Sequence, residues 1–109
     1  MTTYHGFSDG ANQHTQKLAS VAWVIYSPTN ELIASDGICL GPDTNNVAEY
    51  QAAICLMNEA LSSGISHLVI HLESQLVVSQ LNGIYSIRDA TLLPLFWRVH
   101  LLERLFEFI

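Results

Sequence analysis

The fold is decided by one stretch, Gly41 to Leu72, which has the sequence GPDTNNVAEYQAAICLMNEALSSGISHLVIHL. Several possible N-caps lie between Asp43 and Asn46, and apolar residues then recur three and four positions apart, which predicts an amphipathic helix. These apolar positions are Val47, Tyr50, Ile54, Met57 and Leu61. Gly64 suits the left-handed position that ends a helix, and the apolar run from His67 to Leu72 predicts a short strand. The stretch therefore predicts a helix that leads directly into a strand.

The residues before this helix predict three antiparallel strands. Tyr4 to Asp9 is expected to form the first, because the turn-forming cluster Asp9-Gly10-Ala11-Asn12 follows it. Ala19 to Tyr26 is the second, and after a turn the chain returns through Glu31 to Leu40, where Gly37 weakens the strand or marks a bulge. A helical crossover normally joins parallel strands of one sheet, so the His67 to Leu72 strand should lie parallel to one of these three.

Two further helices are expected after the fourth strand. Ser74 is a possible cap for a helix that ends at Leu81, and a longer apolar helix begins at about Asp89 and continues toward Ile109. Pro94 is compatible with this helix only in its first turn. The pattern predicts an α/β fold, a mixed sheet of three antiparallel strands and a parallel fourth with packed helices, in one domain spanning residues 1–109.

The composition limits the function classes. The chain has 109 residues, with 4 Lys+Arg against 10 Asp+Glu and a formal net charge of −6. So few cations weigh against a strong electrostatic hold on nucleic acid, because Lys and Arg carry most phosphate binding. The N-terminal residues lack the basic and apolar pattern of a secretory leader, and charged residues interrupt the last helix. We therefore expect an intracellular protein, cytoplasmic or nuclear.

Three carboxylates stand out by position. Asp9 and Glu73 follow the first and fourth strands, so they emerge at the same sheet edge if these strands are parallel neighbours. Glu49 lies about 110° from the centre of its helix's apolar face, on a flank that can overlook the sheet. Carboxylates this close repel one another unless a divalent cation lies between them, and oxygen ligands suit Mg²⁺ or Mn²⁺. The alternative is that each is a solvated charge at a turn or helix start.

Three motifs, taken in order, resemble type I ribonuclease H, more narrowly its reverse-transcriptase-associated and plant-type branch. The motifs are Phe7-Ser8-Asp9-Gly10-Ala11, the run TNNVAEYQA from Thr44 to Ala52, and the run ESQLVV from Glu73 to Val78. The resemblance extends from Tyr4 to about Ile109 and implies a ribonuclease H-like mixed sheet. It ends before the family's last strand and the segment with its last acidic ligand, so a domain incomplete at its C-terminus is expected.

The resemblance implies an endonuclease that hydrolyses the RNA strand of RNA·DNA hybrids with two Mg²⁺ (or Mn²⁺) ions. The family's metal-binding and catalytic carboxylates match Asp9, Glu49 and Glu73, the last at a position where the family ordinarily has Asp. One ion is then expected to activate water and the other to stabilise the leaving 3′-oxygen. The residues that match the family's substrate contacts are Gly10, Ala11, Thr44, Asn45 and Gln75.

An alternative is a ribonuclease H-like module that binds nucleic acid or assembles without catalysis. Glu73, the absent last acidic ligand and the few cations favour this alternative. A different site is also conceivable, because His5 and His71 face the same side of their strands and approach each other if the strands adjoin. A His-carboxylate site for Zn²⁺ or Mn²⁺ would follow, although lone strand histidines are more often structural.

The last helix predicts self-association. It carries more apolar residues than one face can bury. They are Leu92, Leu95, Phe96, Val99, Leu102, Leu105, Phe106, Phe108 and Ile109. The His67 to Leu72 strand is also expected to be an unprotected sheet edge, so a homodimer through this edge and the terminal helix is predicted. Trp23 and Trp97 lie in apolar settings and are expected to pack in the core rather than stack on nucleobases.

Overall fold

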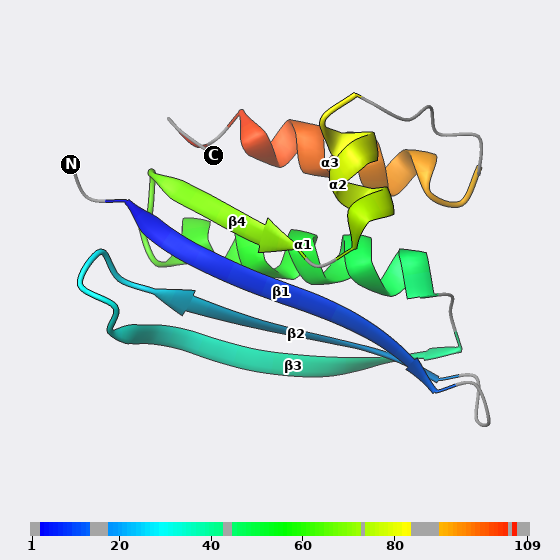
Figure 1. Ribbon diagram of the computed structural model, residues 1–109, viewed down its shortest axis with the longest axis horizontal. Coiled ribbons are helices and arrows are strands. Elements are labelled where there is room, and N and C mark those ends of the chain that lie inside the picture. Colours follow the sequence, from blue (N-terminus) through cyan, green and yellow to red (C-terminus); the bar gives the residue numbers. More distant parts are fainter. Residues whose placement is uncertain are drawn as a thin grey trace.

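The computed structural model describes residues 3–13, 18–42, 45–72, 74–83, 90–104 and 106. Strands and helices follow one another in the predicted order (Figure 1). The strands are β1 (Tyr4–Gln13), β2 (Leu18–Tyr26), β3 (Leu32–Pro42) and β4 (Leu68–Leu72), and the helices are α1 (Asn45–Ser62), α2 (Gln75–Leu81) and α3 (Leu93–Glu103).

The four strands form one mixed sheet in the order β3-β2-β1-β4. β1 pairs with β2 and β2 pairs with β3 in antiparallel fashion, whereas β1 pairs with β4 in parallel. The antiparallel meander and the parallel fourth strand are thus confirmed, and α1 forms the crossover between them (Figure 1). β1 is a central strand, and β4 is an edge of the sheet within the described residues, as predicted.

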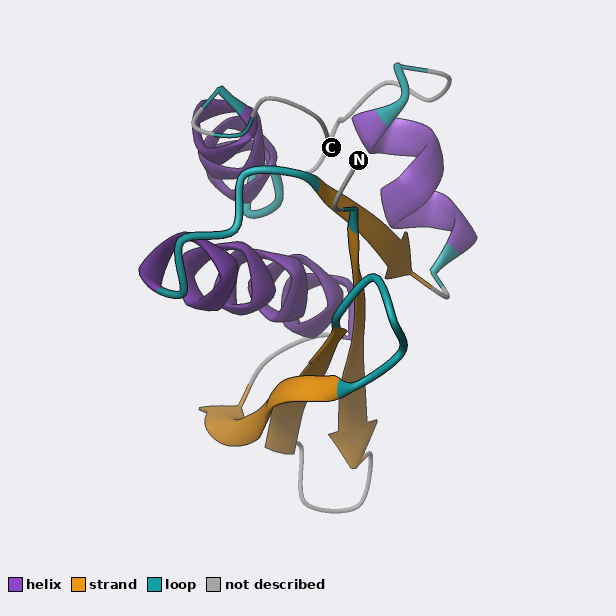
Figure 2. Cartoon of the chain, turned by 90° about the vertical axis from the view of Figure 1, so that its left-hand side faces the viewer, coloured by secondary structure: helices purple, strands orange, loops and turns teal. Residues whose placement is uncertain are grey.

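The two faces of the sheet differ. Figure 2 shows α1 and α3 on the same side of the sheet, and the side chains between helices and strands form the core. Ile25 of β2, Leu56 and Met57 of α1 and Leu68 of β4 are fully buried there. Each such burial stabilises the fold by roughly 1.5 to 3 kcal/mol. The opposite face carries Phe7, whose side chain is 43% exposed.

The end of the first strand was predicted wrongly. β1 does not turn at Asp9 and Gly10 but continues to Gln13, and Gly10 pairs with Val21 of β2. Pairing with β2 along residues 9–13 overrides the local turn preference of these residues. Gly37 marks no bulge either, since it pairs with Ala22 and the register shifts of β2 and β3 lie elsewhere.

Local signals set the ends of α1 and α2 where they were expected. Gly64 and Gly83 both adopt positive φ, 76° and 77°, just after α1 and α2. The Ser74 hydroxyl accepts a hydrogen bond from the Val77 N–H at 3.3 Å and caps α2, as predicted. Pro94 lies in the first turn of α3. α3 is shorter than predicted, and Asp89, Leu105 and residues 107–109 lie outside the described residues.

The two tryptophans differ in environment. Trp23 is 8% exposed and packs in the core as predicted, but Trp97 is 58% exposed, so its predicted burial is wrong. α3 carries apolar residues on both its buried and its exposed sides: Val99 and Leu102 are buried, while Leu101, four residues after Trp97, is 57% exposed. In the part of the chain that the structure describes, no helix is both long and apolar enough to cross a membrane.

Candidate active site

β1 and α1 approach each other closely at Gly10. A Cβ atom at Gly10 would lie 2.4 Å from both the carbonyl carbon of Ala48 and the amide nitrogen of Glu49. Any side chain at this position would therefore collide with the helix backbone, which cannot yield as a flexible side chain can. The glycine allows the first turns of α1 to lie directly against the strand.

This close approach places Glu49 beside β1. The Gly10 N–H donates a hydrogen bond to Glu49 Oε1 at 3.1 Å, and the Glu49 residue is only 5% exposed. The predicted flank position of Glu49, overlooking the sheet, is thus confirmed. A hydrogen bond to a fixed peptide group orients the carboxylate, because neither partner's backbone is free to move.

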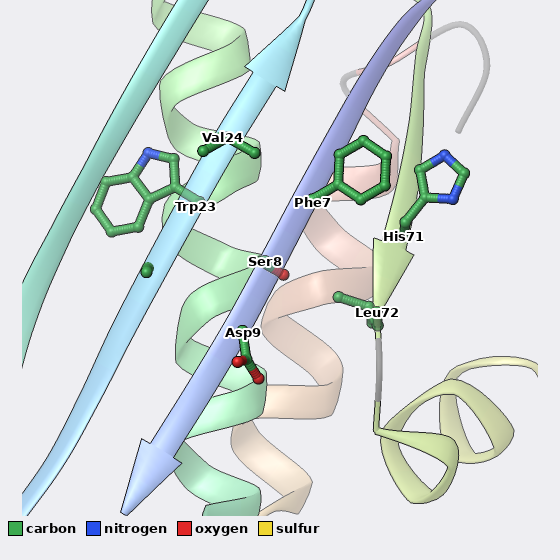
Figure 3. A pocket seen from close by; sticks show the side chains of 8 residues that line it. Phe7, Ser8, Asp9, Trp23, Val24, His71 and Leu72 are labelled. Atoms are coloured by element: carbon green, nitrogen blue, oxygen red, sulfur yellow. The ribbon is translucent and has the colours of Figure 1, made fainter.

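The Asp9 side chain lies on the open face of the sheet, opposite α1. It is exposed, and it lines a cavity of about 410 Å³ on the open face of the sheet (Figure 3). Figure 3 shows the Asp9 carboxylate farther along β1 than Phe7, whose ring lies beside that of His71. Successive residues of a strand point to opposite faces, so Asp9 faces the cavity while Gly10 faces α1. Asp9 and Glu49 therefore approach the junction of β1 and α1 from opposite sides of β1.

Glu73 and Thr44 lie outside the described residues. The register of the two parallel strands is nevertheless clear: Ser8, which precedes Asp9, pairs with Leu72, which precedes Glu73. The parallel neighbourhood on which the Glu73 prediction rests is thus confirmed. The place of the Glu73 carboxylate remains a prediction.

The other predicted substrate contacts lie on three elements. Gly10 and Ala11 belong to β1, Asn45 is the first residue of α1, and Gln75 is exposed at the first position of α2. The side chains of Ala11 and Asn45 lie outside the described part of the structure. Gly10 itself is buried, because α1 covers it.

Comparison with known proteins decides the family. The profile of a family described as reverse transcriptase-like matches residues 7–109, nearly the whole chain. A ribonuclease H1 crystal structure also superimposes on 97% of the chain at 32% identity. The chain belongs to the ribonuclease H type I family. The sheet order and the ribonuclease H structures that superimpose on the chain confirm the expected ribonuclease H-like mixed sheet.

Three ribonuclease H relatives illustrate the similarity. Ribonuclease HI of Halobacterium salinarum is 35% identical over 88 residues, 81% of this chain. Its crystal structure superimposes with a TM-score of 0.93 at 32% identity, over 97% of this chain and 80% of that one. The N-terminal ribonuclease H domain of Rv2228c from Mycobacterium tuberculosis has a TM-score of 0.93 at 25% identity, over 100% of this chain and 79% of that one.

The third relative, the ribonuclease H1 LC11 isolated from compost, was solved in complex with an RNA/DNA hybrid. It has a TM-score of 0.87 at 23% identity, over 98% of this chain and 83% of that one, a likeness that concerns the fold alone. The chain spans less than half the length of the curated relatives it matches, 44% of the halobacterial protein and 28% of the mycobacterial one.

The burial of Ser8 and the hydrogen bond between Tyr50 and Gln80 were not anticipated from the sequence. Ser8 is 5% exposed, and its hydroxyl has no hydrogen-bond partner among the described residues. A polar residue at a core-facing strand position was the available signal. Tyr50 donates to Gln80 Oε1 at 2.6 Å, which joins α1 to α2, and burial raises the pKa of Tyr50 to about 12. No spacing rule predicts a contact between residues 30 positions apart.

The donor set of this ribonuclease H-like site suits a hard divalent cation. Asp9 and Glu49 offer carboxylate oxygens from adjoining elements, and the predicted third ligand, Glu73, would add a further carboxylate. Within the described residues, which omit Glu73, no group of three or more His, Cys, Asp or Glu side chains could hold a metal ion. The oxygen donors present fit Mg²⁺ or Mn²⁺.

Proposed function

We propose that this chain hydrolyses the RNA strand of RNA·DNA hybrids in a Mg²⁺- or Mn²⁺-dependent reaction, with Asp9, Glu49 and Glu73 as the metal-binding and catalytic carboxylates. The observation that carries the proposal is the hydrogen bond from the Gly10 N–H to Glu49 Oε1. It holds the buried carboxylate of Glu49 next to Gly10, the residue that follows Asp9. Membership of the ribonuclease H family supplies the reaction class.

The protein's part in this reaction is placement. The bond to Gly10 fixes the orientation of Glu49, and the ladder between β1 and β2 holds the backbone of Asp9, which pairs with Ala22. When bound, a pair of Mg²⁺ ions supplies an activated water and charge stabilisation at the leaving 3′-oxygen. Rigid placement matters because a displacement of about 1 Å can lower a rate roughly 100-fold.

Hybrid recognition is proposed to use short polar groups and peptide groups. Candidates are the backbone of Gly10 and Ala11 near the ribose 2′-hydroxyl, Thr44 at a phosphate, and Asn45 and Gln75 in the minor groove. Such contacts detect groove shape and the 2′-hydroxyl, so they need fewer cations than duplex DNA recognition. A hybrid as the substrate class rests on membership of the ribonuclease H family.

Cleavage of labelled substrates tests this proposal. The chain should cut the RNA strand of a hybrid in Mg²⁺ or Mn²⁺ and leave a DNA duplex intact. Asp9→Asn should lower the rate at least ~100-fold because it removes a charge at the site. Asp36→Asn, which alters an exposed strand aspartate of β3, is the matched control and should retain activity. Equal rates for the two variants would contradict the proposal and indicate a contaminating nuclease.

A second candidate function is hybrid binding with little or no cleavage. Glu73 favours it, because a side chain one methylene longer than Asp displaces the carboxylate by about 1 Å. Glu73→Asp should then raise the cleavage rate or tighten Mg²⁺ binding measured by calorimetry, whereas Glu73→Gln should abolish both. Indifference to both substitutions would show that Glu73 is only a charge near the start of α2.

A further inference from the structure

Two histidines from distant parts of the sequence meet on the open face of the sheet. The Nδ1 atom of His5 in β1 lies 3.0 Å from the Nε2 atom of His71 in β4, and the two rings lie partly stacked, with centroids 5.3 Å apart. The sequence placed both rings on one face, and the parallel pairing of β1 with β4 brings them together. A hydrogen bond between two ring nitrogens requires one of them to carry no proton and to accept with its lone pair. This lone pair is the group that a metal ion would bind.

The nitrogen separation fits a shared metal ion. Zn²⁺ binds imidazole nitrogen at about 2.0–2.1 Å, so two such bonds at roughly 90–110° place the nitrogens about 2.9–3.4 Å apart. The observed 3.0 Å lies within that interval. Replacing the hydrogen-bonded proton by a metal ion therefore needs rotation of the two rings and little movement of the strands.

The surroundings hold one ring in place and leave room for further ligands. Phe7 stacks on His71 with centroids 4.4 Å apart and planes 12° apart, a contact that uses the face of the imidazole and leaves its nitrogen edge available. A cavity of about 460 Å³, also lined by Tyr26 and Asn30, opens beside the pair. Since a water occupies about 30 Å³, this space accommodates the waters that would complete a coordination shell.

We propose that His5 and His71 form a binding site for Zn²⁺ or a similar divalent transition metal ion, with two protein ligands and the remaining positions taken by water. Imidazole suits Zn²⁺, Cu²⁺ and Ni²⁺, whereas Mg²⁺ prefers oxygen ligands. His5 also precedes Asp9 by four residues of β1, roughly 13 Å along a strand. His71, in contrast, lines the same cavity as Asp9 and lies two residues before Glu73, so it is the ligand chemistry, imidazole nitrogen instead of carboxylate oxygen, that separates this site from the carboxylates.

A metal ion bound by both histidines would link β1 to β4. His5 and His71 are 66 residues apart in sequence, and β4 is a five-residue strand at the edge of the sheet. A metal ion that binds the folded pair and not the unfolded chain stabilises the folded state by mass action. The ion would therefore hold β4 against β1.

Calorimetric titration of the 109-residue chain with Zn²⁺, in excess Mg²⁺, tests the site. We expect one ion per chain at this site, and His5→Asn and His71→Asn should each weaken binding at least ~10-fold, a change of about 1.4 kcal/mol. The control His100→Gln removes an imidazole that bonds Glu103 at 3.1 Å and should leave the affinity unchanged. Asp9→Asn should also leave it unchanged, which separates this site from the proposed nuclease centre.

Circular dichroism should show that Zn²⁺ raises the melting temperature of the unaltered chain but not that of His71→Asn. If a variant fails to fold, electron paramagnetic resonance of Cu²⁺ bound to the unaltered chain counts the nitrogen ligands directly. Two nitrogens support the site, and fewer than two overturn it. Zn²⁺ binding that survives both histidine substitutions, or that is lost with His100→Gln or Asp9→Asn, would also overturn it.

Discussion

The two faces of the sheet differ in what covers them: α1 and α3 pack on one face, and the other carries exposed side chains. On the covered face, Ser8 and Gly10 of β1 are buried beneath the helices, and a residue as small as glycine is needed where α1 approaches. On the open face, Phe7 and Asp9 of the same strand are exposed. Because neighbouring strand residues alternate between faces, β1 contributes residues to both the covered and the open face. The candidate nuclease site uses this alternation at Asp9 and Gly10, where a solvent-facing carboxylate adjoins a helix-facing peptide.

The largest expected difference between the faces concerns truncation of large apolar side chains. Leu56 is fully buried against β1, so Leu56→Ala should lower the free energy of unfolding by about 3 to 4 kcal/mol. Phe7 is 43% exposed, so Phe7→Ala should cost only about 1 kcal/mol despite removing more atoms. Urea denaturation measures both values. A larger loss for Phe7→Ala than for Leu56→Ala would mean that the open face is covered in solution.

The next largest effect is expected at the two glycines of β1 that face α1. In Gly10→Ala the new methyl would meet helix backbone at 2.4 Å, whereas in Gly6→Ala it would meet the Leu56 side chain at 2.8 Å. Backbone cannot move aside locally, so Gly10→Ala should destabilise by about 3 kcal/mol and Gly6→Ala by about 1 kcal/mol. Urea denaturation again provides the comparison. Equal stabilities of the two variants would argue against close contact between β1 and the start of α1.

A smaller effect is expected from the buried hydroxyl that joins α1 to α2. Tyr50→Phe leaves Gln80, 6% exposed, without the 2.6 Å bond and should cost about 1 to 2 kcal/mol at neutral pH. Burial raises the pKa of Tyr50 from 10.0 to about 12, so the folded state holds this proton more tightly than the unfolded chain. The resulting stability is complete below pH 10 and is lost as the pH rises toward 12, by an amount on the order of 2 kcal/mol.

Unfolding measured between pH 8 and pH 12 detects this loss, and Tyr50→Phe should remove its contribution. Tyr26→Phe, which alters a half-buried tyrosine on the open side, serves as the control. A Tyr50→Phe variant with the same alkaline stability loss as the unaltered chain would contradict the assignment.

The smallest effect on stability is expected on the outer surface of α3. Leu101 is 57% exposed, so Leu101→Glu should change the free energy of unfolding by less than about 0.5 kcal/mol. If the predicted homodimer forms through α3 and the β4 edge, the same substitution should convert it to a monomer in light scattering. A monomer mass for the unaltered chain at rising concentration would defeat the dimer prediction. Leu92, Val99, Leu102 and Phe106 are buried within this one chain, whereas Leu93, Trp97 and Leu101 are large apolar residues of α3 that the structure shows exposed and available for such a contact.

Much of the fold could be predicted because its signals are local. The three-and-four spacing in α1 and the positive φ of Gly64 correspond to the predicted helix and its end. The first strand was predicted too short, because turn preference is a local property whereas the ladder that extends β1 to Gln13 depends on β2. Trp97 was misplaced for a similar reason: an apolar neighbourhood in sequence does not reveal which side of α3 faces solvent.

The candidate site could be predicted in outline and not in detail. Helical geometry placed Glu49 on a flank and the strand period placed His5 and His71 on one face, and both proved correct. The bond between Gly10 and Glu49 could not be foreseen, since it depends on how closely two elements pack. The same holds for Tyr50 and Gln80, which come together through packing of α1 against α2.

The rate at which Glu49→Gln cleaves the RNA strand of a hybrid, in single-turnover conditions with Mg²⁺, tests the central claim most directly. The Glu49 carboxylate of α1 accepts a hydrogen bond from the Gly10 N–H, whereas Glu59, farther along the same helix, has no part in the proposed site. The account predicts a loss of at least ~100-fold for Glu49→Gln and an unchanged rate for Glu59→Gln, with both variants folded. Undiminished cleavage by Glu49→Gln would contradict the claim that the junction of β1 and α1 is the nuclease centre.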